Sequence, residues 1–452
     1  MKIGEIHPYQ GSTFMDYKSK ILMLGIALAS LAFIGISCPF GGGGATTGPA
    51  NVTLTYWRMD DDEAVFKPLI EAFKEKNPDV DIVYKRINPA DYKEKLLNAL
   101  AANKGPDIVS LPNDWLPMFV DKLLPAPDSV MTAKQFKDTF VPVASDDLVI
   151  DNKIYGMPLY IDSLALFYNN ELSSAIRLFK PPKTWSEFIL DAKKLTIKKN
   201  DRIIQSGAAL GTAKNTENAT DILSLLMLQN GTEMVSSDKK SATFNVSQGT
   251  EGGKPVYLAA RALNFYTSFA NPDKPTYMWN DNMPTSVRAF AQDKAVMMIH
   301  YSSIQSILKA LNPTLSYDIA PIPQISTIET PINFANYNFE AITKDSIISS
   351  KNPRTYQTAW EFIKFISTGQ IHTKYLQATK KPSSLNEDTQ SYRDVFESQA
   401  NTAKNWYKID SIRIEIIFED MIRDVVNFHQ PIQRSIDSAA AKITNLLKTN
   451  ED

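Results

Sequence analysis

Residues 52–112 read VTLTYWRMDDDEAVFKPLIEAFKEKNPDVDIVYKRINPADYKEKLLNALAANKGPDIVSLP. Residues 52–57 alternate β-branched and aromatic side chains, as a half-buried strand does, and residues 63–78 are amphipathic with a helix stop at Asn-Pro. A second strand, a second helix and a short, wholly apolar strand follow at residues 79–87, 90–103 and 105–112. This order predicts a parallel α/β sheet with ligand-binding loops at the carboxyl ends of its strands.

Beyond residue 155 the pattern changes. Residues 155–169 (YGMPLYIDSLALFYN) form a long strand-like run that could pass from one sheet to another. Residues 181–196 predict a helix in which the N-cap Thr184 and Glu187 form a capping box. From there to about Leu311 the chain is predicted to be mainly helical, which indicates a second, more helical lobe.

Strand signals return at YDIAPIPQ (317–324) and YNFEAIT (337–343), followed by a helix at 355–367 and a last helical stretch at 412–447. Strands that reappear after a helical insertion indicate that the chain revisits its first lobe. We therefore expect two lobes, built from residues 52–160 with about 336–380, and from residues 161–335 with about 381–450.

The N-terminal region has the parts of an export signal. Cys38, the only cysteine, follows the uninterrupted apolar run ILMLGIALASLAFIGIS at residues 21–37, and Lys18 and Lys20 precede that run. A positive region, an apolar region and small residues before a cleavage point are typical of a secretory signal peptide. We predict a signal peptide over residues 1–37, cleavage before Cys38, and lipid attached to its sulfur.

Residues 38–51 contain four consecutive glycines and no periodic apolar residues, so they predict a flexible tether behind the lipidated Cys38. The pattern is similar to a bacterial lipobox, except that Gly35 stands where a larger aliphatic residue is usual. The signal starts at residue 1 or at Met15. The alternative is an uncleaved N-terminal membrane helix. Both place the body at the outer face of the cytoplasmic membrane.

Composition narrows the class of protein. The net charge is −2 and the sequence pI is about 6.2, without a long basic stretch, which argues against a nucleic-acid partner. Hydrophobic residues make up 43% of the chain, enough for two packed cores. None of the four histidines has a metal-ligand spacing, and the G-x-S-x-G and P-loop motifs are absent. We therefore predict no cofactor or metal, but these absences leave open a glycosidase site built from two carboxylates.

Six stretches resemble the extracellular solute-binding proteins of ABC importers, in the group that includes maltose-binding and other sugar-binding proteins. They occur in the family's order, and they are PLIEAFKEKNPDVDIVY (68–84), GPDIVSLPNDWLPMFVDKLLPAPD (105–128), YGMPLYIDSLALFYNNEL (155–172), PPKTWSEFILDAKKLT (181–196), FAQDKAVMMIHYSS (290–303) and AWEFIKFIS (359–367). YNFEAIT stands where many relatives are richer in glycine, and residues 390–415 match only loosely.

The resemblance implies an α/β, two-lobe periplasmic-binding-protein-like fold (type II). Each lobe would be a mostly parallel sheet flanked by helices, with a cleft that closes on the ligand. It also implies a binding protein, not an enzyme, that captures a sugar or oligosaccharide as a monomer and delivers it to an ABC permease. The alternatives are an exported carbohydrate-active hydrolase, which would pair Asp162 with one of the other acids, and a surface adhesin or structural lipoprotein.

Sugar sites combine carboxylates and amides with flat aromatic rings, so the candidates are acids and aromatics on predicted cleft loops. Trp57 ends the first strand next to Asp60 and Asp61, which would accept hydrogen bonds from hydroxyls. The competing interpretation is a core tryptophan followed by a solvated acidic loop. Asp114 and Trp115 follow the buried strand at 105–112, where the resemblance matches Asp114 to a sugar-contacting acid; a helix cap and ordinary packing compete.

Asp162 is the strongest single candidate, because a carboxylate in so apolar a run needs a reason to be there. The resemblance matches it to a ligand-binding acid, and Tyr160 lies on the same strand face. The competing interpretation is an acid satisfied by backbone amides. Further aromatic candidates, for which core packing competes, are Trp279, Tyr301, which the resemblance matches to a stacking aromatic, and Tyr337, which lies between Asn336 and Asn338.

Overall fold

The computed structural model describes residues 51–174, 180–327, 329–346, 352–386 and 394–449, and residues 49–452 form one compact unit. The predicted signal peptide and Cys38 lie outside the described residues. Within those described ranges, no helix is long and apolar enough to cross a membrane.

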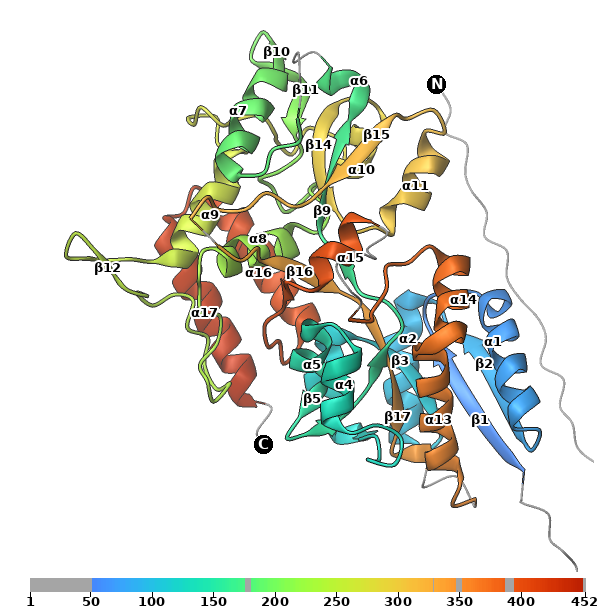
Figure 1. The fold of residues 1–452 in the computed structure, drawn as a ribbon. Coiled ribbons are helices and arrows are strands. Elements are labelled where there is room, and N and C mark those ends of the chain that lie inside the picture. Colours follow the sequence, from blue (N-terminus) through green and yellow to red (C-terminus); the bar gives the residue numbers. More distant parts are fainter. Residues whose placement is uncertain (1–50, 175–179, 328, 347–351, 387–393, 450–452) are drawn as a thin grey trace, which may run out of the picture. The chain divides into compact units, whose positions relative to one another are not determined.

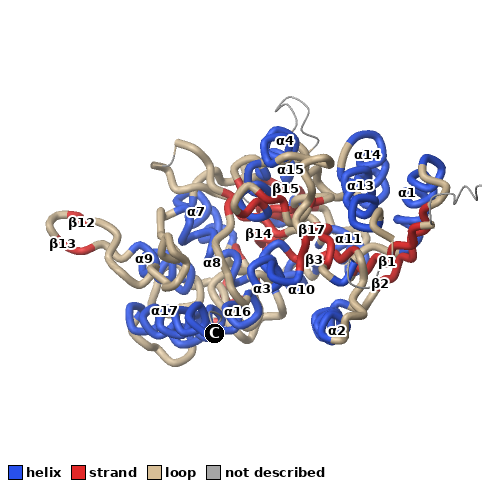
Figure 2. The backbone as a smooth tube through the Cα atoms, turned by 90° about the horizontal axis from the view of Figure 1, so that it is seen from below, coloured by secondary structure: helices blue, strands red, loops and turns tan. Residues whose placement is uncertain are grey.

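The first sheet is built from the segment at residues 52–112. Its strand order is β2-β1-β3-β17-β4, with β7 also paired to β17. Strands β1, β2 and β3 are parallel, as predicted, whereas β17 is antiparallel to β3. Helix α2 covers one face of the sheet, and α1, α13 and α14 cover the other (Figure 2).

Seven elements were predicted here, and they lie close to their expected bounds: β1 (Val52–Arg58), α1 (Glu63–Lys76), β2 (Val80–Arg86), α2 (Pro89–Ala101), β3 (Ile108–Pro112), β17 (Asn338–Thr343) and α13 (Thr355–Ser367). The other elements around this sheet are α3 (Leu116–Phe119), β4 (Leu123–Leu124), α4 (Ala133–Thr139), α5 (Pro142–Leu148), β7 (Met157–Pro158) and α14 (Gly369–Thr379). Strands β5 (Val149–Ile150) and β6 (Lys153–Ile154) form a separate two-stranded sheet.

The second sheet has the order β10-β11-β14-β9-β15 and is mixed, not mostly parallel as expected. Only β11 and β14 pair in parallel, because β9 lies between β14 and β15 and runs antiparallel to both. The interval between residue 196 and Leu311, predicted to be mainly helical, thus contributes strands to this sheet. Their apolar runs are too short for periodicity to separate them from buried helices.

The elements around the second sheet include the predicted helix with its capping box of Thr184 and Glu187. They are β9 (Ala165–Asn169), α6 (Asn170–Ser173), α7 (Trp185–Leu195), β10 (Ile197–Lys199), β11 (Arg202–Ala208), α8 (Ala219–Gln229), β12 (Thr250–Glu251), β13 (Lys254–Pro255), α9 (Leu258–Ser268), α10 (Ser286–Ala291), β14 (Ala295–His300), α11 (Ile304–Leu311), β15 (Tyr317–Ala320), α15 (Val395–Ala400), α16 (Ser411–Val426) and α17 (Ile432–Thr449).

Three strands form a small separate sheet in the order β18-β16-β8: β8 (Asp162–Ser163), β16 (Asn333–Asn336) and β18 (Ala403–Lys404). The run at 155–169 therefore passes from the first sheet through this small sheet to the second, as three short strands. Strands β16 and β17 take the chain back to the first sheet (Figure 1). One hydrophobic cluster packs around the first sheet, and two others around the second.

Candidate binding cleft

Three pockets adjoin one another near the small sheet, and Asn336 of β16 lines all of them. We name them the Tyr301 pocket (810 Å³), the Asp147 pocket (780 Å³) and the Glu415 pocket (160 Å³), and together the cleft. Of the predicted site residues, Tyr160, Asp162 and Tyr301 line the Tyr301 pocket, and Asp114 lines the other two. The structure thus brings four separate candidates to one cleft.

Asp162 is held by donors from its own chain. Oδ1 accepts the backbone N–H groups of Ser163 and Ser302, both at 2.9 Å, and Oδ2 accepts the Ser302 hydroxyl at 2.7 Å and the Ser303 N–H at 3.3 Å. Only 5% of the residue is exposed. Its four acceptor positions are therefore filled, and its main role here is to join β8 to the start of α11.

Lys408 lies between acids that come from distant parts of the chain. Its Nζ is 3.7 Å from Asp114 Oδ2, at the end of β3, and 3.8 Å from Asp221 Oδ1 on α8. Within the described part of the chain the ammonium has these ion pairs but no hydrogen bond, and its side chain is 12% exposed. The Tyr301 hydroxyl donates to Asp221 at 2.7 Å. The N–H donors of Lys408, which form no hydrogen bond with a described residue, therefore lie beside carboxylate acceptors inside the cleft.

Aromatic rings hold this lysine in place. The ring centroids of Phe334 and Trp406 each lie 5.5 Å from Lys408 Nζ. Trp406 stacks on Phe418, with centroids 5.5 Å apart and planes at 28°, and its indole N–H donates to Ser224. Burial raises the pKa of Asp114, and the neighbouring Lys408 opposes that increase. The ammonium thus offsets the cost of burying the acids beside it.

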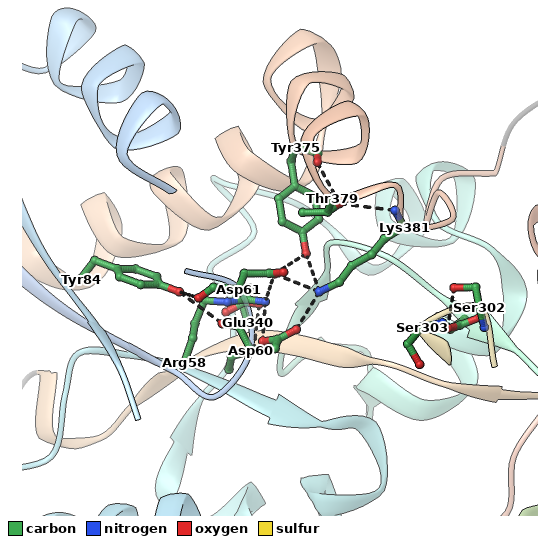
Figure 3. Close-up of polar contacts among 12 residues, drawn as sticks. Arg58, Asp60, Asp61, Tyr84, Ser302, Ser303, Glu340, Tyr375, Thr379 and Lys381 are labelled. Carbon is green, nitrogen blue, oxygen red and sulfur yellow. Dashed lines mark hydrogen bonds and ion pairs between the residues drawn. The ribbon is translucent and has the colours of Figure 1, made fainter. Parts of the chain in front are cut away.

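Asp60 and Asp61 do not line the cleft; they belong to an ion network next to it (Figure 3). The Arg58 guanidinium reaches Asp60 at 2.8 Å and Asp61 at 3.1 Å, and Lys381 Nζ reaches them at 2.8 and 2.9 Å. Burial would raise the pKa of Asp60, but the two cations outweigh it and hold that pKa well below its usual range. Both acids are therefore paired with cations of the chain itself and are not free to bind a ligand.

The network extends into the core through Glu340 of β17, which is fully buried and pairs with Arg58 Nη1. Glu340 also accepts hydrogen bonds from the hydroxyls of Tyr56 (2.6 Å) and Ser110 (3.1 Å). Burial raises the pKa of Glu340, and Arg58 opposes the increase. Lys381 Nζ lies 4.1 Å from the Tyr160 ring centroid, so the network also positions a ring that lines the Tyr301 pocket.

Tyr337 is fully buried, and its hydroxyl donates to Asp147 Oδ2 at 2.8 Å. The side-chain amides of Asn113 (3.1 Å) and Asn405 (2.8 Å) donate to the same oxygen. Burial raises the pKa of Asp147 to about 6, although these three hydrogen bonds favour the ionised form. Tyr337 therefore supports the wall of the Asp147 pocket and does not face a ligand directly.

The raised pKa of Asp147 predicts a pH dependence of stability. Its folded-state value of about 6 lies above the unfolded value near 4, so the folded protein binds more protons between these limits. Folding stability should therefore rise as pH falls from 7.5 to 5, and this group contributes about 2–3 kcal/mol over its full titration. In Asp147→Asn the amide oxygen can accept two of the three donors and does not titrate. Urea denaturation at pH 7.5 and 5 should show a smaller pH effect in this variant; equal pH effects in both proteins would contradict the assignment.

The three tryptophans predicted to contact the ligand lie outside the cleft. Trp57 is half-buried on the face of β1 opposite Tyr56 and Arg58, and its ring lies 5.0 Å from Lys85 Nζ. Trp115 stacks on Phe119 with centroids 5.8 Å apart. Trp279 is fully buried, and its indole N–H donates to Asn215. None of these rings lines the cleft, because each is engaged by the packing of its own sheet.

Sequence reasoning missed several residues that line the cleft. Asp221 was not singled out because an acid in the first turn of a helix has an ordinary local explanation. Trp406 and Lys408 fall in residues 390–415, where the family resemblance is loose. The run Asn-Trp-Tyr-Lys at 405–408, two rings next to a cation, was the available signal. Among the described residues, no cluster of three or more His, Cys, Asp or Glu side chains could hold a metal ion.

A family model described as bacterial extracellular solute-binding protein matches residues 68–397, and the chain belongs to that family. Among curated proteins, one from Brucella abortus (strain 2308), named for binding alone, is 25% identical over 319 residues, covering 69% of this chain and 70% of that protein. A maltotriose-binding protein of Pyrococcus abyssi is 27% identical over 143 residues, covering 32% of this chain and 30% of that protein.

Solved structures confirm the two-lobe α/β fold expected from the sequence. The sugar-binding protein MalE from Xanthomonas citri matches with a TM-score of 0.71 at 20% identity, covering 88% of this chain and 98% of that chain. The cyclic α-maltosyl-1,6-maltose binding protein from Arthrobacter globiformis matches with a TM-score of 0.71 at 18% identity, covering 89% and 100%. At these identities the likeness establishes the fold.

Proposed function

We propose that this protein captures a sugar or oligosaccharide in the cleft and delivers it to an ABC importer. The observation that carries the proposal is the group of Asp114, Lys408 and Asp221. Lys408 Nζ, whose N–H groups donate no hydrogen bond to a described residue, lies 3.7 Å from the Asp114 carboxylate and 3.8 Å from the Asp221 carboxylate. A hydroxyl both donates and accepts hydrogen bonds, so adjacent hydroxyls of a sugar can bridge such an array. Tyr160, Tyr301 and Trp406 add rings for the apolar faces of sugar units.

The proposed capture mechanism is closure of two lobes about the strands β8 and β16. The lobes would be those expected from the sequence, residues 52–160 with about 336–380, and 161–335 with about 381–450. Asp114 would approach the ligand from the first lobe, and Asp221 and Tyr301 from the second. Closure would bury the ligand between them and present a different shape to the permease.

Attachment to the membrane is a further part of the proposal. Export and lipidation at Cys38, with residues 38–51 as the tether, would hold a monomeric binding protein at the outer face of the cytoplasmic membrane, near its permease. Stable attachment of this kind needs more than one acyl chain. Family membership supports a location outside the cytoplasm. Mass spectrometry of the mature N-terminus would identify the lipid and the cleavage point.

The proposal predicts that Asp114→Asn weakens sugar binding by about 10- to 100-fold, since one charged hydrogen-bond acceptor is lost. A thermal-shift screen of monosaccharides and oligosaccharides, with polyols, peptides and polyamines as comparators, would first identify a ligand. A ligand at 100 times its Kd should add about 2.7 kcal/mol of stability. Isothermal titration would then compare the wild type with Asp114→Asn.

Asp121→Asn is the matched control, because that exposed acid pairs with Lys122 and does not line the cleft. Its sugar affinity should equal that of the wild type. A screen in which peptides or polyamines stabilise the protein and no carbohydrate does would reject sugar capture. Equal affinities of Asp114→Asn and Asp121→Asn would instead reject the placement of the site.

A further inference from the structure

The Tyr301 pocket and the Glu415 pocket carry opposite excess charge. The acids Asp114, Asp221 and Glu415 line the Glu415 pocket with a single cation, Lys408. In the Tyr301 pocket the acid is Asp162, and the cations are Lys309, Lys380 and Lys381. A solute that lies along the cleft therefore meets hydroxyl-accepting carboxylates at one end and ammonium groups at the other.

The single acid of the Tyr301 pocket offsets only part of the charge of its cations. Asp162 accepts two hydrogen bonds at each oxygen, all from uncharged groups of Ser163, Ser302 and Ser303, so it carries at most one negative charge and forms no ion pair with a described residue. Lys381, by contrast, is already paired, because its Nζ contacts Asp60, Asp61 and the Tyr375 hydroxyl. Figure 3 shows its side chain directed toward those acids, with Ser302 and Ser303 apart from the network.

Lys309 of α11 and Lys380, which follows α14, remain available. Neither side-chain ammonium group forms an ion pair or a hydrogen bond with any described residue, and both lysines line the pocket. Lys380 also occupies the left-handed region at φ 59°, where glycine is favoured and other residues are strained. A lysine at this φ costs backbone stability that a glycine would restore, but it places a positive charge at the pocket.

We infer that the Tyr301 pocket receives an anionic substituent of the bound carbohydrate, a carboxylate as in a uronic acid or a phosphate ester, through Lys309 and Lys380. This inference rests on the proposed sugar capture and names the class of sugar. The neutral part of the ligand would lie toward Lys408, so the charges also set its direction in the cleft. Because both lysines are exposed, the preference should be largest at low salt.

The test is isothermal titration with neutral and acidic probes built on the same sugar. The probes are glucose, glucuronate and glucose 6-phosphate, the three corresponding galactose compounds, and α-1,4-galactotriose with α-1,4-trigalacturonate. At low salt we expect at least one acidic probe to bind about 10- to 100-fold more tightly than its neutral counterpart. The advantage should shrink at 10 times the salt concentration. Whether carboxylate or phosphate binds better identifies the source of the charge.

The double variant Lys309→Met, Lys380→Gly should bring the ratio of acidic to neutral affinity close to one. Glycine at position 380 relieves the strained φ, so unfolding by urea should show no loss of stability from that change. Lys374→Met, on α14 but outside the pocket, should keep the wild-type ratio. Neutral sugars that bind as well as acidic ones, or an unchanged ratio in the double variant, overturn this inference alone. No binding of any probe would overturn the proposed sugar capture together with it.

Discussion

Arg58→Met should lower the free energy of unfolding by about 3–5 kcal/mol, the largest effect we expect from a single substitution in this protein. Arg58 is fully buried and bonds to Asp60, Asp61 and Glu340. Without it, Glu340 would keep only hydroxyl donors, and Lys381 alone would balance the other two acids. Urea denaturation followed by tryptophan fluorescence would measure the loss.

Arg86→Met is the control that the sheet itself provides. Arg86 lies beside Arg58 in the parallel register of β1 and β2, but it is half exposed and pairs with the exposed Asp62. Its replacement should cost less than about 1 kcal/mol. Adding Glu340→Gln to Arg58→Met should recover part of the stability by removing the unpaired buried charge. Similar small losses in both arginine variants would show that the network is dispensable for folding.

Lys408→Met should weaken binding of the identified sugar by about 100- to 1000-fold. The change removes the central hydrogen-bond donor and also leaves Asp114 and Asp221 without the cation between them. Methionine keeps most of the apolar stem that packs between Phe334 and Trp406. Titration calorimetry measures the affinity, and a urea melt of the same sample reports whether the fold survives.

Lys344→Met serves as the comparison, because Lys344 is exposed and lies outside all three pockets of the cleft. Its affinity should match that of the wild type. Lys408→Arg keeps the charge, so it should bind more tightly than Lys408→Met. A Lys408→Met protein that folds normally and binds sugar with wild-type affinity would remove this lysine, and the array built on it, from the site.

Elements with strong local signals were predictable in detail. Helix α13 spans the predicted residues 355–367, and α7 begins after the predicted capping box of Thr184. The last helical stretch, predicted as one, is two helices because Pro431 interrupts it between α16 and α17. The second sheet was not predictable, because its strand β9 is paired by segments about 130 and 150 residues further along the chain.

The residues of the candidate site were also predictable only in part. Asp114 and Tyr301 could be identified from a strand end and a family resemblance, and the structure places both at the cleft. Asp162 was identified as an acid that needs partners, and those partners, Ser302 and Ser303, are 140 and 141 residues away. No local pattern distinguishes an acid that awaits a ligand from one that the chain itself satisfies.

The segment at 52–112 determined the first three strands and two helices by itself, because periodicity, stop signals and strand order act over a few residues. Family membership followed from six such segments in order, and the match over residues 68–397 confirms it. Only the tertiary structure determined which charged groups are paired within the chain. Asp60 and Asp61 pair with Arg58 and Lys381, and Asp114 lies beside Lys408. The physical reason is that an ionised side chain takes its role from the charges and donors within about 4 Å of it, and here most of those come from distant parts of the chain.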